Sequence, residues 1–151
     1  MLVLDNVKIK PNLFIFYNDL SKSGYVVFFQ FENSLGLAVE TAISIDINNP
    51  PTSTYIGIFE FATPTNITGT DPYISVRIYN KTNKNYEWFT NGRQSLVLPV
   101  VSAWECVFSA TVLVQSLNSA FEYKIEFINN TGVTLNTEYA SRASVALINV
   151  R

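Results

Sequence analysis

The sequence predicts an all-β protein, and three observations support that prediction. Apolar and polar residues alternate with a period of two over many short segments, helical periodicity is almost absent, and Pro, Gly and Asn separate the segments. The clearest alternation lies at 121–127, where four apolar residues share one face and three charged residues share the other. Segments of this kind without a βαβ rhythm are typical of an antiparallel sandwich or barrel.

About ten or eleven strands are expected in chain order. Two of them carry aromatic residues on one face and aliphatic residues on the other, and we expect both to be central in a sheet or covered on both sides. These two are 25–32 and 55–61. Two others place Ile and Val on an inner face beneath a polar outer face, and these are 42–48 and 73–79. The remaining candidates are 2–9, 13–17, 86–89, 95–101, 104–114 and 144–150.

The breaks between these strands contain turn-forming residues. Asn91-Gly92 is the strongest hairpin signal in the chain, because this dipeptide readily adopts the positive φ angles of tight turns. Only 33–40 and 114–120 have a pattern that would hold a helical turn or two. The whole chain, 1–151, is therefore predicted to be a single antiparallel β-sandwich of the jelly-roll type with about 8–10 strands. The other predicted turns are 48–51, 63–64, 70–72 and 129–132.

The composition excludes many functions. The chain of 151 residues has no His, one Cys, six isolated Gly and a net charge of −2. A histidine base, a His or Cys metal site, a phosphate loop and a basic nucleic-acid surface are therefore not expected, and neither are a cofactor, a metal or an enzymatic activity. Cys106 is interpreted as a small buried hydrophobe.

Two carboxylates would suffice for glycoside hydrolysis, so this is the enzyme class that survives the lack of histidine. The strand acids all occupy alternating positions, however, where a side chain ordinarily faces solvent. Solvent-facing side chains are therefore expected for Glu60, Glu105, Glu122 and Glu126.

Neither a secretory signal nor a membrane span is expected from the sequence. No segment at the start has the pattern of a secretory signal, and no apolar run is long enough to span a membrane, so membrane insertion is not expected.

Three Asn-x-Thr glycosylation triplets begin at Asn66, Asn80 and Asn129. They matter only if the protein is made in a host that glycosylates.

One segment is a candidate ligand site. Residues 79–93 are polar and cationic first and aromatic afterwards, and Tyr86, Trp88 and Arg93 would form a loop that stacks on a carbohydrate or a receptor. The alternative is an ordinary strand in which Trp88 packs inward.

The low surface charge favours an assembly. Charged residues make up 15% of the chain, whereas about a quarter is usual for soluble domains. Val, Ile and Thr together account for 41 residues and Asn for 16. A subunit with few charges has little repulsion to keep it from its neighbours, so self-association is expected.

In style the whole chain resembles the small single jelly-roll proteins of virus particles, the capsid, vertex and turret subunits. The features that carry the resemblance are the start without a signal, the 8–10 strands, the Asn- and Thr-rich composition, the abrupt strand edge at 96–101 and the final strand at 144–151. The resemblance implies a homo-oligomeric shell or spike protein that meets other structural proteins and is located in a virion assembled in the host cytoplasm. The final strand is also similar to the trimeric TNF-like and C1q-like jelly rolls, which belong with the carbohydrate- or receptor-binding alternative.

Overall fold

A computed structural model describes residues 2–3, 8–17, 23–64, 67, 71–100 and 103–150, with side chains described for 36–64, 67, 71–92, 106–135 and 142–148. The described chain consists of strands and connections without a helix, so the all-β prediction is confirmed. The strands are β1 (Leu2–Val3), β2 (Lys8–Tyr17), β3 (Ser23–Leu37), β4 (Thr41–Asn48), β5 (Ser53–Thr63), β6 (Tyr73–Asn80), β7 (Asn85–Val100), β8 (Ala103–Leu117), β9 (Glu122–Asn130) and β10 (Leu135–Val150).

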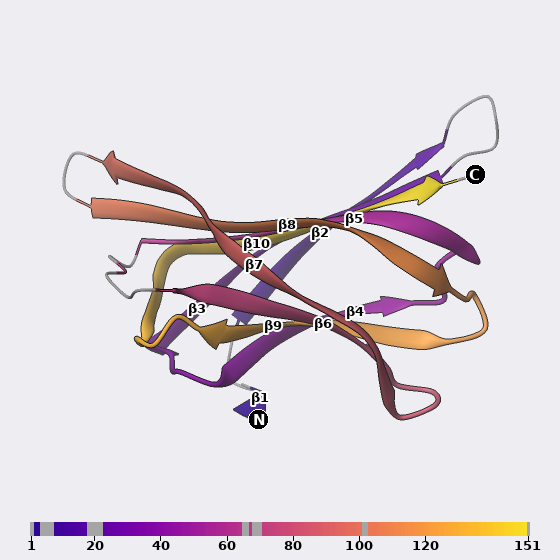
Figure 1. The fold of residues 1–151 in the computed structure, drawn as a ribbon, viewed down its shortest axis with the longest axis horizontal. Coiled ribbons are helices and arrows are strands. Elements are labelled where there is room, and N and C mark those ends of the chain that lie inside the picture. The colour runs from indigo at the N-terminus through magenta and orange to yellow at the C-terminus, as the bar shows by residue number, and fades with distance from the viewer. Residues whose placement is uncertain are drawn as a thin grey trace.

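The strands form two layers joined through β7. Hydrogen bonding links them in the order β1-β4-β9-β6-β7-β8-β5-β10-β3-β2, and every pair except β1–β4 is antiparallel. The first part of β7 pairs with β6, and the part from Arg93 onward pairs with β8. Figure 1 shows β8, β5 and β10 stacked over β9, β6 and β4, with β7 crossing from one layer to the other. The antiparallel β-sandwich expected from the sequence is therefore confirmed.

From β3 to β10 the chain changes layer at most connections. The lower sheet contains β1, β4, β9, β6 and the first part of β7, and the upper sheet contains the rest of β7 with β8, β5, β10, β3 and β2. Two hairpins in this part of the chain keep consecutive strands in one layer: β6–β7, whose turn spans residues 81–84, and β7–β8, in which Val100 pairs with Ala103. Most of the other pairings join strands that are not consecutive in the sequence.

The core lies between the two sheets. The ring centroids of Phe61 on β5 and Phe127 on β9 are 6.0 Å apart, although three strands separate β5 from β9 in the hydrogen-bonded order. Contact between such strands is possible only across the interior of the sandwich. The inward faces predicted for 73–79 and 121–127 are confirmed, because Ile74, Val76 and Ile78 are buried together with the apolar residues of β9.

The Asn91-Gly92 hairpin prediction is wrong. Both residues lie within β7, where Gly92 pairs with Ile74 and Arg93 pairs with both Tyr73 and Ser109. A Cβ on Gly92 would lie 3.4 Å from the Ile74 carbonyl oxygen and 3.5 Å from the Ser109 backbone. These are ordinary van der Waals distances, so at this point Gly92 is one residue of a continuous strand between β6 and β8, and the chain does not reverse there.

The two candidate helical segments are also not helical. Residues 33–37 continue β3, and residues 114–117 continue β8. Tight turns follow both strands, at 39–40 and 119–120. The turns predicted at 48–51 and 129–132 are confirmed, since Asn49 and Gly132 both have positive φ angles in connections between strands.

Candidate functional site

The predicted ligand residues Tyr86 and Trp88 lie on opposite faces of the lower sheet. Tyr79 pairs with Tyr86 and Ile78 pairs with Trp88, so Glu87 is an extra residue that opposes nothing on β6. Such a β-bulge reverses the alternation of the strand. Trp88 therefore shares the inner face with buried Ile78, whereas Tyr86 shares the outer face with Tyr79.

Trp88 packs inward, as the alternative interpretation of this segment expects. It is half-buried against the core, and its ring stacks on Phe59 with centroids 5.4 Å apart. This position removes Trp88 from any ligand surface on the outer face.

We predict that Trp88→Ala will lower the free energy of unfolding by about 2–4 kcal/mol, somewhat less than the loss for a fully buried aromatic ring, because the Trp88 ring is only half-buried. The measurement is urea unfolding followed by circular dichroism. Trp88→Phe keeps the contact with Phe59 and is expected to recover most of the loss. Unfolding unchanged in Trp88→Ala would place the indole outside the core.

Tyr86 is part of an aromatic and cationic cluster on the outer face. Arg77 Cζ lies 4.1 Å from the centroid of the Tyr86 ring, and Arg77 Nη2 donates a hydrogen bond of 3.1 Å to Tyr86 Oη. The ring of Tyr79 lies 4.9 Å from that of Tyr86, and Lys124 Nζ lies 5.0 Å from the Tyr79 ring. These contacts fix Arg77 above the sheet.

The expectation that all four strand acids face solvent is wrong for Glu126. Its side chain is 0% exposed, and its Oε2 lies 3.7 Å from Arg77 Nη2. β9 is flanked by β4 and β6, so Ser44 and Arg77 sit directly opposite Glu126 on its two sides. Glu60 and Glu122 are exposed as expected, and the side chain of Glu105 lies outside the described residues.

The electrostatics of the cluster keep the Tyr86 phenol neutral. Partial burial raises the pKa of Tyr86, and the nearby Glu126 carboxylate raises that pKa further, whereas Arg77 opposes the shift. The phenol therefore adds no charge to a cluster in which Arg77 and Glu126 are opposite in sign and adjacent and Lys124 lies beyond Tyr79.

Of the three predicted ligand residues, only Tyr86 is shown on the outer face. Arg93 is described by its backbone pairing with Tyr73, and its side chain lies outside the described residues. The residue of the outer-face cluster that the sequence did not single out is Arg77. The alternation at 73–79 marks Arg77 as outward, but the bulge at Glu87 hides the matching pattern on β7.

Two of the three glycosylation triplets have a structural role. Asn80 and Asn129 are fully buried, and each side-chain nitrogen is engaged, Asn80 Nδ2 with Glu87 Oε1 at 2.8 Å and Asn129 Nδ2 with two carbonyl oxygens. Neither nitrogen is open to a modifying enzyme in the folded protein. Asn66 lies outside the described residues.

Cys106 is buried, as predicted. Within the described part of the chain, no three acidic or cysteine side chains gather into a potential metal site. The same residues contain no helix that would cross a bilayer.

Comparison with known proteins assigns no family. No protein-family model matches the chain, and no curated protein matches it either.

Proposed function

We propose that the protein is a structural subunit that associates with copies of itself, with the jelly-roll arrangement and the role of the virus capsid, vertex and turret proteins. The alternation of the eight strands from β3 to β10 between the row β4-β9-β6-β7 and the row β8-β5-β10-β3 supports the jelly-roll assignment. Under this proposal the protein is located in the virion, which is assembled in the host cytoplasm.

An apolar row on the outer face of the upper sheet carries the proposal. Ile56 pairs with Leu113 on one side and with Ile148 on the other, and their exposed fractions are 38%, 52% and 46%. The adjacent row, Thr111, Ile58 and Ala146, contains no charge. An outward sheet face is ordinarily polar, so an apolar row across three strands indicates a surface that is covered in the assembled state.

A second copy of the chain is the occupant that this surface fits. The apolar rows are uncharged, and the described part of the same face carries Glu60 and Arg142, which are of opposite sign and line one small depression. Two copies of the face therefore meet without like-charge repulsion, and apolar surface complements apolar surface.

We predict a native mass several times 17.0 kDa, and the first test is light scattering at two protein concentrations and two salt concentrations. Leu113→Glu is expected to weaken association by at least about tenfold, because it places a charge in the apolar row. Association is expected to persist at high salt, since burial of apolar surface is not screened.

Val39→Glu is the matched control, because Val39 is also an exposed aliphatic residue but lies in the turn after β3. It is expected to leave the mass unchanged. A monomer under all four conditions would contradict self-association. An equal effect of both variants would contradict its assignment to the Leu113, Ile56 and Ile148 row.

A further inference from the structure

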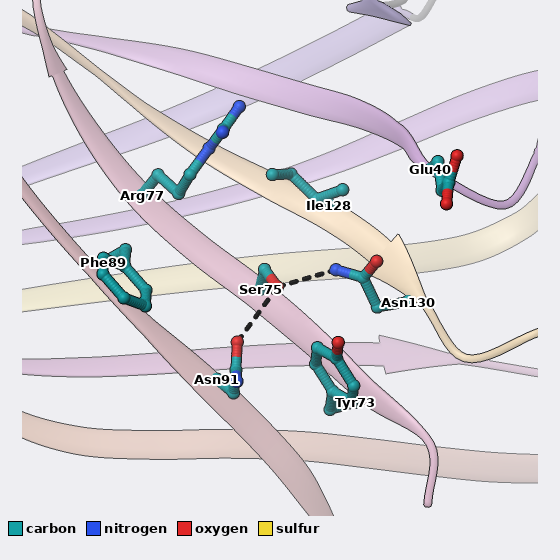
Figure 2. Close-up of a pocket in the computed structure, with 8 residues that line it drawn as sticks. All are labelled: Glu40, Tyr73, Ser75, Arg77, Phe89, Asn91, Ile128 and Asn130. Carbon is teal, nitrogen blue, oxygen red and sulfur yellow. Dashed lines mark hydrogen bonds between the residues drawn. The ribbon is translucent and has the colours of Figure 1, made fainter. Parts of the chain in front are cut away.

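A groove of about 500 Å³ lies on the outer face of the lower sheet, on the opposite side of the sandwich from the apolar row. β6 runs along its floor, β7 and β9 form its sides, and Glu40 closes one end (Figure 2). Its polar residues lie among aromatic rings, a combination that recognises small polar molecules with apolar faces. The lining residues are Glu40, Tyr73, Ser75, Arg77, Phe89, Asn91, Ile128 and Asn130.

A chain of hydrogen bonds fixes the two amides in the groove. Asn130 Nδ2 donates to Ser75 Oγ at 2.6 Å, and Ser75 Oγ donates to Asn91 Oδ1 at 3.0 Å, as Figure 2 shows. Because the hydroxyl has a single proton, this order determines how both amides are turned. It leaves Asn91 Nδ2 as a donor and Asn130 Oδ1 as an acceptor, and neither has a side-chain partner among the described residues.

Aromatic rings flank this pair of amides along the strands. Phe89 pairs with Arg77, two residues along the strands from the Ser75–Asn91 pair. Tyr73 lies two residues from Ser75 in the other direction. The rows of Phe89 and Tyr73 are separated by four residues, about 13 Å along the strands. Phe89 is 73% exposed, the largest exposed fraction among the large hydrophobic residues described, so its ring is available to a ligand.

The groove does not favour a charged ligand. Arg77 is paired with the buried carboxylate of Glu126, so its positive charge is largely balanced. Glu40 is exposed at the end of the groove and repels anions. Phosphate, sulfate and carboxylate groups are therefore poor partners for this surface.

We propose that this groove binds an uncharged oligosaccharide. One sugar ring stacks its C–H face on Phe89, and hydroxyls of the ligand bond to Asn91 Nδ2 and Asn130 Oδ1, one accepting and one donating. A sugar hydroxyl both donates and accepts hydrogen bonds, and the span between Phe89 and Tyr73 suits a short chain of sugars. This proposal is independent of the self-association proposed above, which uses the other sheet.

The test is an array of immobilised neutral glycans built from glucose, galactose, mannose or N-acetylglucosamine, with sialylated and sulfated glycans as a second arm. The glycan that binds best is then titrated against the full-length protein by calorimetry. Neutral glycans are expected to bind, and Phe89→Ala and Asn91→Ala are each expected to reduce the affinity by at least about tenfold. Circular dichroism and thermal unfolding of both variants are expected to match those of the parent protein.

Two further variants make the test specific. Phe89→Trp keeps an exposed aromatic ring and is expected to retain binding, and Leu113→Glu on the opposite face is expected to bind as the parent does. Absence of neutral-glycan binding, a preference for the sialylated or sulfated arm, or binding unaffected by Phe89→Ala would each overturn the proposal. A monomeric parent protein that still binds neutral glycans would contradict the self-association proposal alone.

Discussion

Replacing Phe127 by alanine is expected to lower the free energy of unfolding by about 3–5 kcal/mol. The ring is 1% exposed and meets Phe61 across the interior at 6.0 Å between centroids. Removing it takes away apolar area and leaves a cavity between two sheets that hydrogen bonds hold in place, so the surroundings cannot collapse onto the vacancy. Urea unfolding monitored by circular dichroism measures the difference, with the urea dependence of the free energy compared to check that the denatured state is unchanged.

Phe89→Ala is the matched control, because it makes the same chemical change on a ring that is 73% exposed. Its effect on the free energy of unfolding is expected to stay within about 0.5 kcal/mol. Equal losses in the two variants would mean that Phe127 does not lie in a packed core, and the assignment of inner and outer faces would then be wrong.

Local patterns predicted the faces of the strands well. Alternation within a single strand decides which side chains point inward, because successive side chains of a strand project to opposite sides. The inward positions Ile74, Val76, Ile78 and Phe127 therefore required no knowledge of the neighbouring strands. The antiparallel sandwich followed from the number of such strands and the absence of helical periodicity.

Features that depend on a distant strand could not be read locally. Asn91-Gly92 has hairpin chemistry, but the pairing of β7 with β6 and β8 keeps both residues within a continuous strand. The bulge at Glu87 reverses the outward pattern of β7, and this is why Trp88 was grouped with Tyr86 in the candidate site. Glu126 looks like an ordinary solvent-facing acid until Arg77 is placed opposite it by the pairing of β6 with β9.

The candidate groove shows the same limit. Ser75 belongs to β6, Asn91 to β7 and Asn130 to β9, so three strands must pair in the correct register before the hydrogen-bonded chain exists. A shift of one residue in either pairing would turn one amide to the other face. Two of the groove residues, Phe89 and Asn91, lie in the candidate segment 79–93, whereas the others come from strands that only the register places beside them.

Asn129→Ala is expected to destabilise the protein by about 3 kcal/mol or more, although it removes only a small polar side chain. Asn129 is fully buried, and its Nδ2 donates to the carbonyl oxygens of Leu37 and Val133, both at 2.8 Å. Its Oδ1 accepts from the Thr131 backbone nitrogen at 3.0 Å and from Thr131 Oγ1 at 2.6 Å. Alanine leaves these buried backbone groups without their partner, and chemical unfolding measures the cost.

The position of these partners explains why one amide has so large an effect. Leu37 ends β3, Val133 lies in the connection from β9 to β10, and the Asn129 carbonyl oxygen also accepts a hydrogen bond of 2.8 Å from the Glu40 backbone nitrogen. The side chain thus joins the end of an upper-sheet strand to the end of a lower-sheet strand.

Two variants serve as comparisons for Asn129→Ala. Asn129→Asp keeps the two acceptor contacts with Thr131 but loses both donors, so its loss of stability is also expected to be large. Asn85→Ala, at an exposed position in β7, is expected to change the free energy of unfolding by no more than about 0.5 kcal/mol. If Asn129→Ala were as mild as Asn85→Ala, water would have to replace the amide at this end of the sandwich, and faster hydrogen exchange at the Thr131 amide would reveal that opening.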